Sequence, residues 1–172
     1  FLEVAIMSEY KNLLVGVDGS EQSKMAVQKA IDIAKRNNAK LHLLSIVNGE
    51  RYPNTSTVGY GFVDRDIYKK ATDEMTKELA EMKKKAEAAG VSDVVTDVKI
   101  GNAKMELTEG YAKEHDVDLI LVGATGLNMI GRMIVGSTAA YVIRQADCDV
   151  MVIKTDENNK KLNVKMESYP EI

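Results

Sequence analysis

Short apolar runs alternate along this chain with longer segments in which apolar residues recur at helical spacing. Runs with so few polar residues are typical of strands that are buried on both faces of a sheet. The alternation of strands and helices predicts one parallel sheet with helices on both faces, an α/β fold. The predicted strands cover residues 12–18, 41–47, 94–100, 116–122 and 149–153.

Four helices are expected between these strands, and small or polar residues mark several of their ends. Ser20 suits the N-cap of the first helix, and Gly90 suits the C-cap of a long second helix. Residues 48–64 are expected to form a loop, and loops of this length inside a domain are typically functional or mobile. The predicted helices begin after Ser20, near Ile67, at Ala103 and at Thr138, and they end near Asn38, Ala86, His115 and Gln145.

The expected topology brings two polar loops together at one edge of the sheet. In a doubly wound parallel sheet, ligands bind beyond the carboxyl ends of the strands, where the winding reverses. We expect an open five-stranded, Rossmann-like sheet with the order 3-2-1-4-5, which places this reversal between the first and fourth strands. The loops that meet there are residues 18–20 and 123–126, which are rich in glycine and small polar residues. They form the candidate ligand crevice.

Composition and charge limit the classes of partner. The chain has 172 residues, 45% of them hydrophobic and 28% charged, as expected for one globular domain. A net charge of −3 with both signs interspersed favours neither nucleic acid nor a membrane surface as a partner. The single cysteine fits a reducing cytoplasm, where we expect the protein to reside. We expect residues 1–6 to be left over from cloning, ahead of a natural start at Met7. Residues 7–155 are expected to form the domain. Residues 156–172 are expected to form a tail that is either a short edge strand or disordered.

Residues 123–137, with the sequence GATGLNMIGRMIVGS, carry the strongest chemical signal. Gly123 and Gly126 follow the fourth strand, and Gly136 and Ser137 precede a helix after nine intervening residues. Glycines let backbone N–H groups approach an anion closely, and a helix N-terminus favours negative charge. The pattern predicts a phosphate-binding site.

Three common phosphate-binding patterns do not fit this stretch. A Walker A motif needs a lysine where Ser137 stands and a strand directly before Gly131. The dinucleotide fingerprint GxGxxG is absent. A flavodoxin-like phosphorylation receiver needs an aspartate at the end of the third strand, where Lys99, Ile100 and Gly101 stand.

The remaining pattern, G-x2-G-x9-G-[ST], resembles the ATP-binding branch of the universal stress protein family. Gly123, Gly126, Gly136 and Ser137 carry the resemblance, supported by LLVGVDGS at residues 13–20 and ADCDVMVIK at residues 146–154. The resemblance implies an adenine nucleotide alpha hydrolase-like fold, a homodimer paired through the fifth-strand edge, and ATP with Mg²⁺ or Mn²⁺ bridging its phosphates. One departure from the family is Ala124-Thr125, where relatives often have a histidine or arginine between the first two glycines.

The resemblance also implies roles for particular residues. Asp18 would lie beside the adenosine, next to Val17, and the backbone of Ile46 would meet the adenine edge. The ribose and first phosphates would contact residues after the fourth strand, and the outer phosphates would bind at the N-terminus of the last helix. These two groups are Val122, Gly123, Thr125 and Gly126, and then Gly136, Ser137 and Thr138.

Two functional classes remain, with a third disfavoured. The first is a dimeric, nucleotide-dependent regulator in the stress response, and the second is a slow ATPase or phosphotransfer enzyme. The sequence favours the regulator because it has no Walker lysine and no assignable base, so we assign no catalytic residue. A nucleotide-free dimeric interaction module is disfavoured by the intact motif. His42 and His115 are far apart in the sequence, and we expect both to be structural.

Overall fold

The predicted parallel sheet and its strand order are confirmed. The computed structural model describes residues 9–49, 61–125 and 135–160. Within them, five parallel strands form one sheet in the order β3-β2-β1-β4-β5. The strands are β1 (Asn12–Gly16), β2 (Lys40–Asn48), β3 (Val94–Gly101), β4 (Leu119–Gly123) and β5 (Asp149–Ile153).

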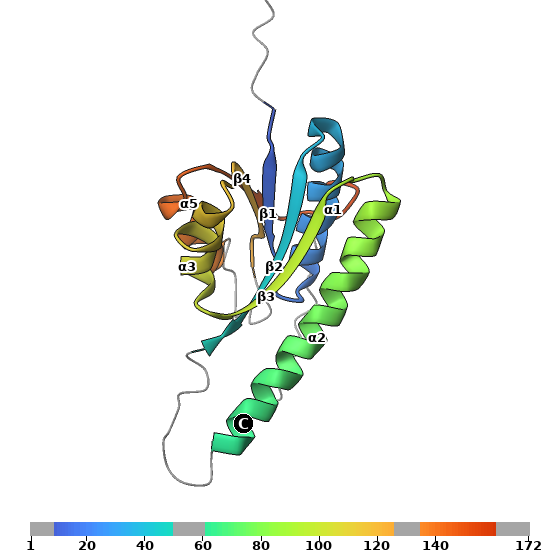
Figure 1. Cartoon of the computed structure of the whole chain (residues 1–172). Coiled ribbons are helices and arrows are strands. Elements are labelled where there is room, and N and C mark those ends of the chain that lie inside the picture. Colours follow the sequence, from blue (N-terminus) through green and yellow to red (C-terminus); the bar gives the residue numbers. More distant parts are fainter. Residues whose placement is uncertain (1–8, 50–60, 126–134, 161–172) are drawn as a thin grey trace, which may run out of the picture.

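Helices cover both faces of the sheet, so the protein has a helical layer on each side (Figure 1). On one face, α1 (Glu21–Asn37) and α2 (Gly61–Ala88) pack over a core that includes Leu13, Leu43 and Leu79. On the other, α3 (Ala103–Thr108), α4 (Tyr111–Glu114) and α5 (Ser137–Gln145) pack over a second core. Strands buried on both faces explain why the sequence shows continuous apolar runs.

Two predicted helix ends are confirmed with their capping chemistry. The Ser20 hydroxyl accepts a hydrogen bond from the N–H of Ser23 at 3.2 Å and caps the N-terminus of α1. At the end of α2, Gly90 has φ +106° and donates to the carbonyl of Glu87, while Val91 donates to that of Ala86. This pair of bonds is the Schellman motif, which needs a left-handed residue and so favours glycine.

The loop predicted over residues 48–64 is shorter than expected, because α2 already begins at Gly61. The prediction took the start of the helix from Ile67, the first residue of the apolar stripe in the sequence, although this residue is 37% exposed. A helix that has formed can extend past its packed part, since each further residue adds one backbone hydrogen bond. Residues 50–60 lie outside the described residues, so a functional or mobile role of this loop stays a prediction.

The prediction of a single helix over residues 103–115 is wrong, because the helix is interrupted near Gly110 and forms two short helices, α3 and α4. The N–H groups of Glu109 and Gly110 both donate to the carbonyl of Met105, at 2.8 and 2.9 Å. A Cβ on Gly110 would lie 2.6 Å from a carboxylate oxygen of Glu106, so this side chain would have to move to admit a larger residue. The break turns Tyr111 into the core, where it is 1% exposed.

The first and fourth strands are shorter than predicted. β1 ends at Gly16, although Val17 still donates to the carbonyl of Leu44 at 2.8 Å. β4 begins at Leu119 because the carboxylate of Asp118 accepts hydrogen bonds from the N–H groups of Lys11 and Asn12 and ends the preceding turn.

None of the helices in the described part of the chain combines the length and the apolar character that a membrane-spanning helix needs.

Candidate functional site

Two loops from distant parts of the chain meet at the carboxyl edge of the sheet, as predicted. The first follows β1 and turns at Gly19, which has φ +82°. Its exposed Asp18 accepts hydrogen bonds from the N–H and the hydroxyl of Ser20, at 3.0 and 2.6 Å. These two bonds hold the Asp18 carboxylate beside the N-terminus of α1.

Gln22, in the first turn of α1, joins this loop to the loop after β4. Its side-chain oxygen accepts hydrogen bonds from the N–H and the hydroxyl of Thr125, both at 2.6 Å. Gln22 and Thr125 are 8% and 7% exposed, so these bonds are screened from water. Thr125, predicted to line the ligand, therefore uses its hydroxyl to fix the crevice.

The sequence analysis missed Gln22, although a signal for it exists. Gln22 precedes Ala26 and Ala30 by one and two helical turns, so it lies on the buried face of α1. A polar residue on a buried stripe requires a hydrogen-bond partner, and it could have been flagged for that reason.

Replacing Gln22 with methionine tests this link between the loops. The change keeps the length of the side chain but leaves two buried donors of Thr125 without an acceptor. We expect the free energy of unfolding to fall by about 2 kcal/mol. Urea denaturation measures it. Gln22→Glu keeps an acceptor in a helix first turn that favours negative charge, so an equal loss in both variants would show that the hydrogen bonds are unimportant.

Gly123, the first glycine of the motif, is required by packing against α1. A Cβ at this position would lie 2.9 Å from the Cβ of Gln22 and 3.0 Å from two backbone atoms of Gln22 and Ser23. Positive φ is not the reason, since the described glycines with positive φ are Gly19 and Gly90. The close approach of α1 to β4 therefore accounts for this glycine without a ligand.

The N-terminus of α5 lies next to the loop after β4. The N–H of Gly136 donates to the carbonyl of Ala124 at 2.6 Å, and Ala124 in turn donates to Ile153 of β5. Gly136 is the N-cap of α5, and no side chain of the cap bonds to the helix. Ser137 is exposed and Thr138 is half-buried in the first turn. Uncapped N–H groups and the positive end of the helix dipole suit an anion here.

The remaining predicted residues can contact a ligand mainly through their backbone. Val17 and Val122 are 3% and 4% exposed, so their side chains belong to the two cores. Ile46 lies on β2, beyond the point where β1 ends. Its backbone groups point to the same side of β2 as those of Leu44, whose carbonyl accepts a hydrogen bond from Val17. Gly126 lies outside the described residues, so its predicted role stays a prediction.

Two surface hollows lie elsewhere among the described residues. One is between α4 and the start of β5, beside Lys113, Asp116 and Cys148, and the other is between α1 and β5, beside Met25 and Met151. Neither contains a residue that the motif predicts. The convergence of the two loops therefore locates the candidate site, because the predicted residues lie there and not beside these hollows.

A second polar cluster is buried between the sheet and α4. His42 and His115 are brought together, with ring centroids 5.1 Å apart, and the Tyr111 ring stacks on His115 at 3.9 Å. His42 is 1% exposed and bonds through Nδ1 to the Tyr111 hydroxyl at 3.0 Å. Burial and the charge of His115 lower the pKa of His42 to about 4, and burial raises the pKa of Tyr111 to about 12. Both groups are therefore neutral at pH 7, which fits a structural role rather than proton transfer.

Comparisons with known proteins agree with the fold and the motif. A model of the universal stress protein family matches residues 9–154. Relatives in Staphylococcus haemolyticus and Staphylococcus saprophyticus that carry this family name are 38% and 36% identical over 151 residues. These matches cover 88% of this chain and 88% and 87% of the relatives.

Solved structures match the whole domain. Universal stress protein UspA of Lactobacillus plantarum is 32% identical, with a TM-score of 0.79 over 86% of this chain and 99% of that one. A universal stress protein solved in complex with cAMP is 29% identical, with a TM-score of 0.64 over 85% of this chain and 98% of that one.

Proposed function

Because the chain belongs to the universal stress protein family, we propose that it binds ATP at the carboxyl edge of its sheet and acts as a dimeric, nucleotide-dependent regulator in the stress response. The observation that carries the proposal is the uncapped N-terminus of α5 beside the loop after β4. Among the described residues no side chain caps these N–H groups, which lie at the position where the motif places phosphates. The similar protein that was solved with cAMP supports an adenine nucleotide as the ligand class.

Each part of the nucleotide would meet a different part of the crevice. The adenine would bond to the backbone of Ile46, on the edge of β2 that β1 leaves unpaired. Asp18 would accept a hydroxyl of the ribose or a base nitrogen. Gly136, Ser137 and Thr138 would hold the outer phosphates, while Gly123 to Gly126 line the ribose and the first phosphates.

The divalent ion would be held mainly by the phosphates of the nucleotide. Among the described residues, no group of three His, Cys, Asp or Glu side chains could enclose a metal ion. Mg²⁺ commonly binds through substrate phosphates and water with few protein ligands, and Mn²⁺ takes similar oxygen ligands. This chemistry fits a crevice made of backbone N–H groups and hydroxyls.

We propose that the dimer forms through β5, which ends the sheet on one side. Met151 of this strand is 37% exposed, and Val150 and Val152 are half-buried. An edge strand presents unpaired backbone groups that can bond to a second chain. A second copy of β5 would cover both these groups and the exposed methionine.

The test is thermal unfolding of the purified chain with and without ATP and Mg²⁺. Ligand at 100 times its dissociation constant stabilises the native state by about 2.7 kcal/mol. For a domain of this size, that raises the melting temperature by roughly 5 to 10 °C. No shift at millimolar ATP would contradict nucleotide binding and favour the nucleotide-free interaction module. Phosphate release in the same samples measures hydrolysis, and sustained turnover would favour the enzyme.

Two substitutions at Gly136 show whether ATP uses the N-terminus of α5. Aspartate and asparagine are equally good N-caps, and Gly136 has φ −70° and ψ 163°, a backbone conformation that both adopt. Gly136→Asp places a carboxylate beside the proposed phosphates, whereas Gly136→Asn adds nearly the same volume without charge. We expect ATP to raise the melting temperature of the aspartate variant much less than that of the asparagine variant. Equal shifts in the two variants would show that the phosphates do not bind at this position.

A further inference from the structure

The second edge of the sheet, β3, is also open, and its outward backbone groups are unpaired within the described residues. Asp93 bonds through its carbonyl to Leu41 of β2, so the backbone groups of residues 94, 96, 98 and 100 point away from the sheet. None of these four residues bonds through its backbone to another described residue outside its own strand. In Figure 1 the sheet is viewed from this edge, with β3 in front and a helical layer on either side.

Apolar side chains are exposed along this edge on the α2 face. Ile100 is 55% exposed, and Thr96 and Val98 are half-buried beside it. Ile67 of α2 is 37% exposed on the same side of the sheet. Long edge strands with apolar side chains are uncommon unless something covers them.

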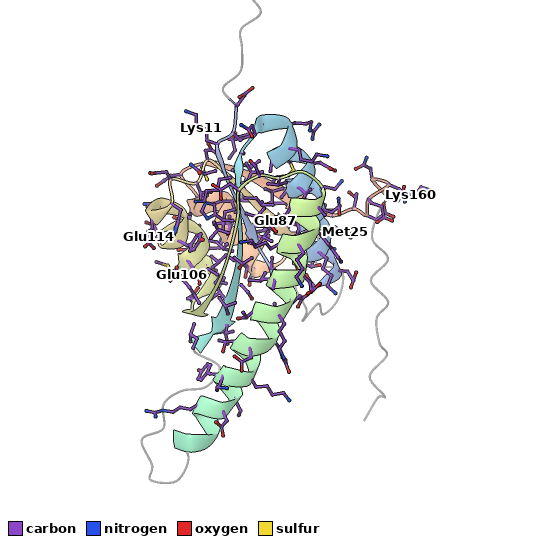
Figure 2. All side chains as sticks on the ribbon, turned by 45° about the vertical axis from the view of Figure 1, so that its right-hand side comes forward. Lys11, Met25, Glu87, Glu106, Glu114 and Lys160 are labelled. Carbon is purple, nitrogen blue, oxygen red and sulfur yellow. The ribbon has the colours of Figure 1, made fainter. Side chains whose placement is uncertain are left out.

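The charges of β3 lie on the opposite face. Asp97 and Lys99 are in register with Leu44 and Ile46 of β2 and face the layer of α3 and α4. Lys99 forms ion pairs with Glu106 at 3.2 Å and Glu114 at 3.7 Å, two residues that lie together in Figure 2. The side chain of Lys99 is still 31% exposed, so it remains accessible from the edge.

We propose that β3 pairs antiparallel with β3 of a second copy of this chain, about a two-fold axis at Val98. In this register, Val98 faces Val98 of the second copy, and Thr96 faces Ile100. All of these residues have outward backbone groups, so each opposed pair exchanges two hydrogen bonds. The two sheets become one continuous sheet, with α2 of both copies on the same face.

Charge complementarity selects this register over its neighbours. With the axis at Val98, Asp97 of each copy stands directly opposite Lys99 of the other, in the closely spaced pairs between the hydrogen-bonded ones. An axis at Asp97 or Lys99 would put like charges opposite each other. An axis at Thr96 would place Lys99 opposite Asp93, which already pairs with Lys40 at 3.7 Å, and would leave Asp97 opposite Val95.

This inference does not depend on nucleotide binding, and it uses a different edge from the β5 dimer proposed above. Each edge then provides a separate association step, and a chain that pairs at both edges assembles beyond a dimer. The charge pattern of β3 then lets the β3 step be removed and restored without changing β5.

Sedimentation equilibrium of charge variants tests the inference. In a dimer of Asp97→Lys, the new lysine at position 97 of each copy faces Lys99 of the other. In a dimer of Lys99→Glu, the new glutamate at position 99 of each copy faces Asp97 of the other. We expect each variant alone to lose one association step of the wild type. An equimolar mixture should regain it, because the lysine introduced in one variant then faces the glutamate introduced in the other, and the native Lys99 faces the native Asp97. Asp32→Lys on α1 changes the net charge equally and should behave as the wild type.

Thr96→Pro gives a second measurement that does not depend on charge. It removes an outward N–H but no bond to β2, and edge strands tolerate proline. We expect it to lose the same association step, with an unchanged circular dichroism spectrum. It also keeps the test usable if Lys99→Glu misfolds through its proximity to Glu106. A wild-type chain that is monomeric at all concentrations, or association that is equal in Asp97→Lys, Thr96→Pro and the wild type, would overturn the inference. The second outcome would leave a β5 dimer standing.

Discussion

Replacing Gly123 with alanine is expected to lower the free energy of unfolding by about 3 kcal/mol, the upper part of the range for overpacking a core. The added Cβ would lie 2.9 Å from the Cβ of Gln22 and 3.0 Å from backbone atoms of Gln22 and Ser23. Backbone atoms of a helix cannot rotate away, so α1 would have to move as a unit. That movement would also strain the bonds between Gln22 and Thr125.

Thermal unfolding without nucleotide measures this effect. A loss of this size lowers the melting temperature of a domain of this length by roughly 6 to 12 °C. Gly101→Ala is the matched control, because the Cβ there would meet only the Glu106 side chain, at 3.9 Å, an ordinary contact. Equal stability of the Gly123→Ala protein and the wild type would show that α1 is not packed as closely on β4 as described.

The outcome also decides how glycine variants of the motif are interpreted. If Gly123→Ala unfolds at a lower temperature without ligand, its failure to bind ATP says nothing about phosphate contacts. The Gly136 variants avoid this ambiguity, since that residue is a helix cap with ordinary backbone angles.

Acidification is expected to destabilise the protein through His42. Its pKa is lowered to about 4 in the folded state, chiefly by burial and then by the charge of His115, against about 6.5 in the unfolded chain. Well above pH 6.5 His42 is neutral in both states, and stability does not depend on it. As the pH falls from 6.5 to 4, the unfolded state takes up the proton first, and the native state loses about 3 kcal/mol.

Urea denaturation at a series of pH values measures the slope, and His42→Asn isolates it. Asparagine keeps a polar atom near Nδ1 for the Tyr111 hydroxyl but does not titrate, so the variant should lose stability less steeply over this window. His115→Asn leaves His42 able to titrate but removes the His115 charge, which opposes protonation of His42 in the folded state. The stability loss should therefore begin at the same pH as in the wild type and end at a higher pH. Parallel curves for the wild type and His42→Asn would show that His42 does not resist protonation.

The elements that could be predicted are those whose signals are local. β5 was predicted to the residue, and both ends of α1 and the C-terminal end of α2 were found because Ser20, Asn38 and Gly90 have intrinsic backbone and capping preferences. The errors arose where non-local contacts decide. The start of β4 depends on Asp118 reaching Asn12, 106 residues away, and the break at Gly110 directs Tyr111 to His42, 69 residues away.

The candidate site divides in the same way. The spacing of Gly123, Gly136 and Ser137 and the strand order were accessible because they follow from the motif and the alternation of elements. The place of Gln22 on the buried stripe of α1 signals that it needs a partner, but no sequence pattern identifies that partner as Thr125, 103 residues away. His42 and His115 were considered separately, although folding brings their rings to 5.1 Å.

By itself, the sequence determined the α/β class, the two polar loops and the family. Apolar periodicity, capping residues and glycine spacing are properties of the chain that need no partner in space. Only the tertiary structure decided why Gly123 must be a glycine, which side chain joins the two loops, and which charges stand at the open edge of β3. Each of these depends on atoms that are distant in sequence and adjacent only after the sheet has formed.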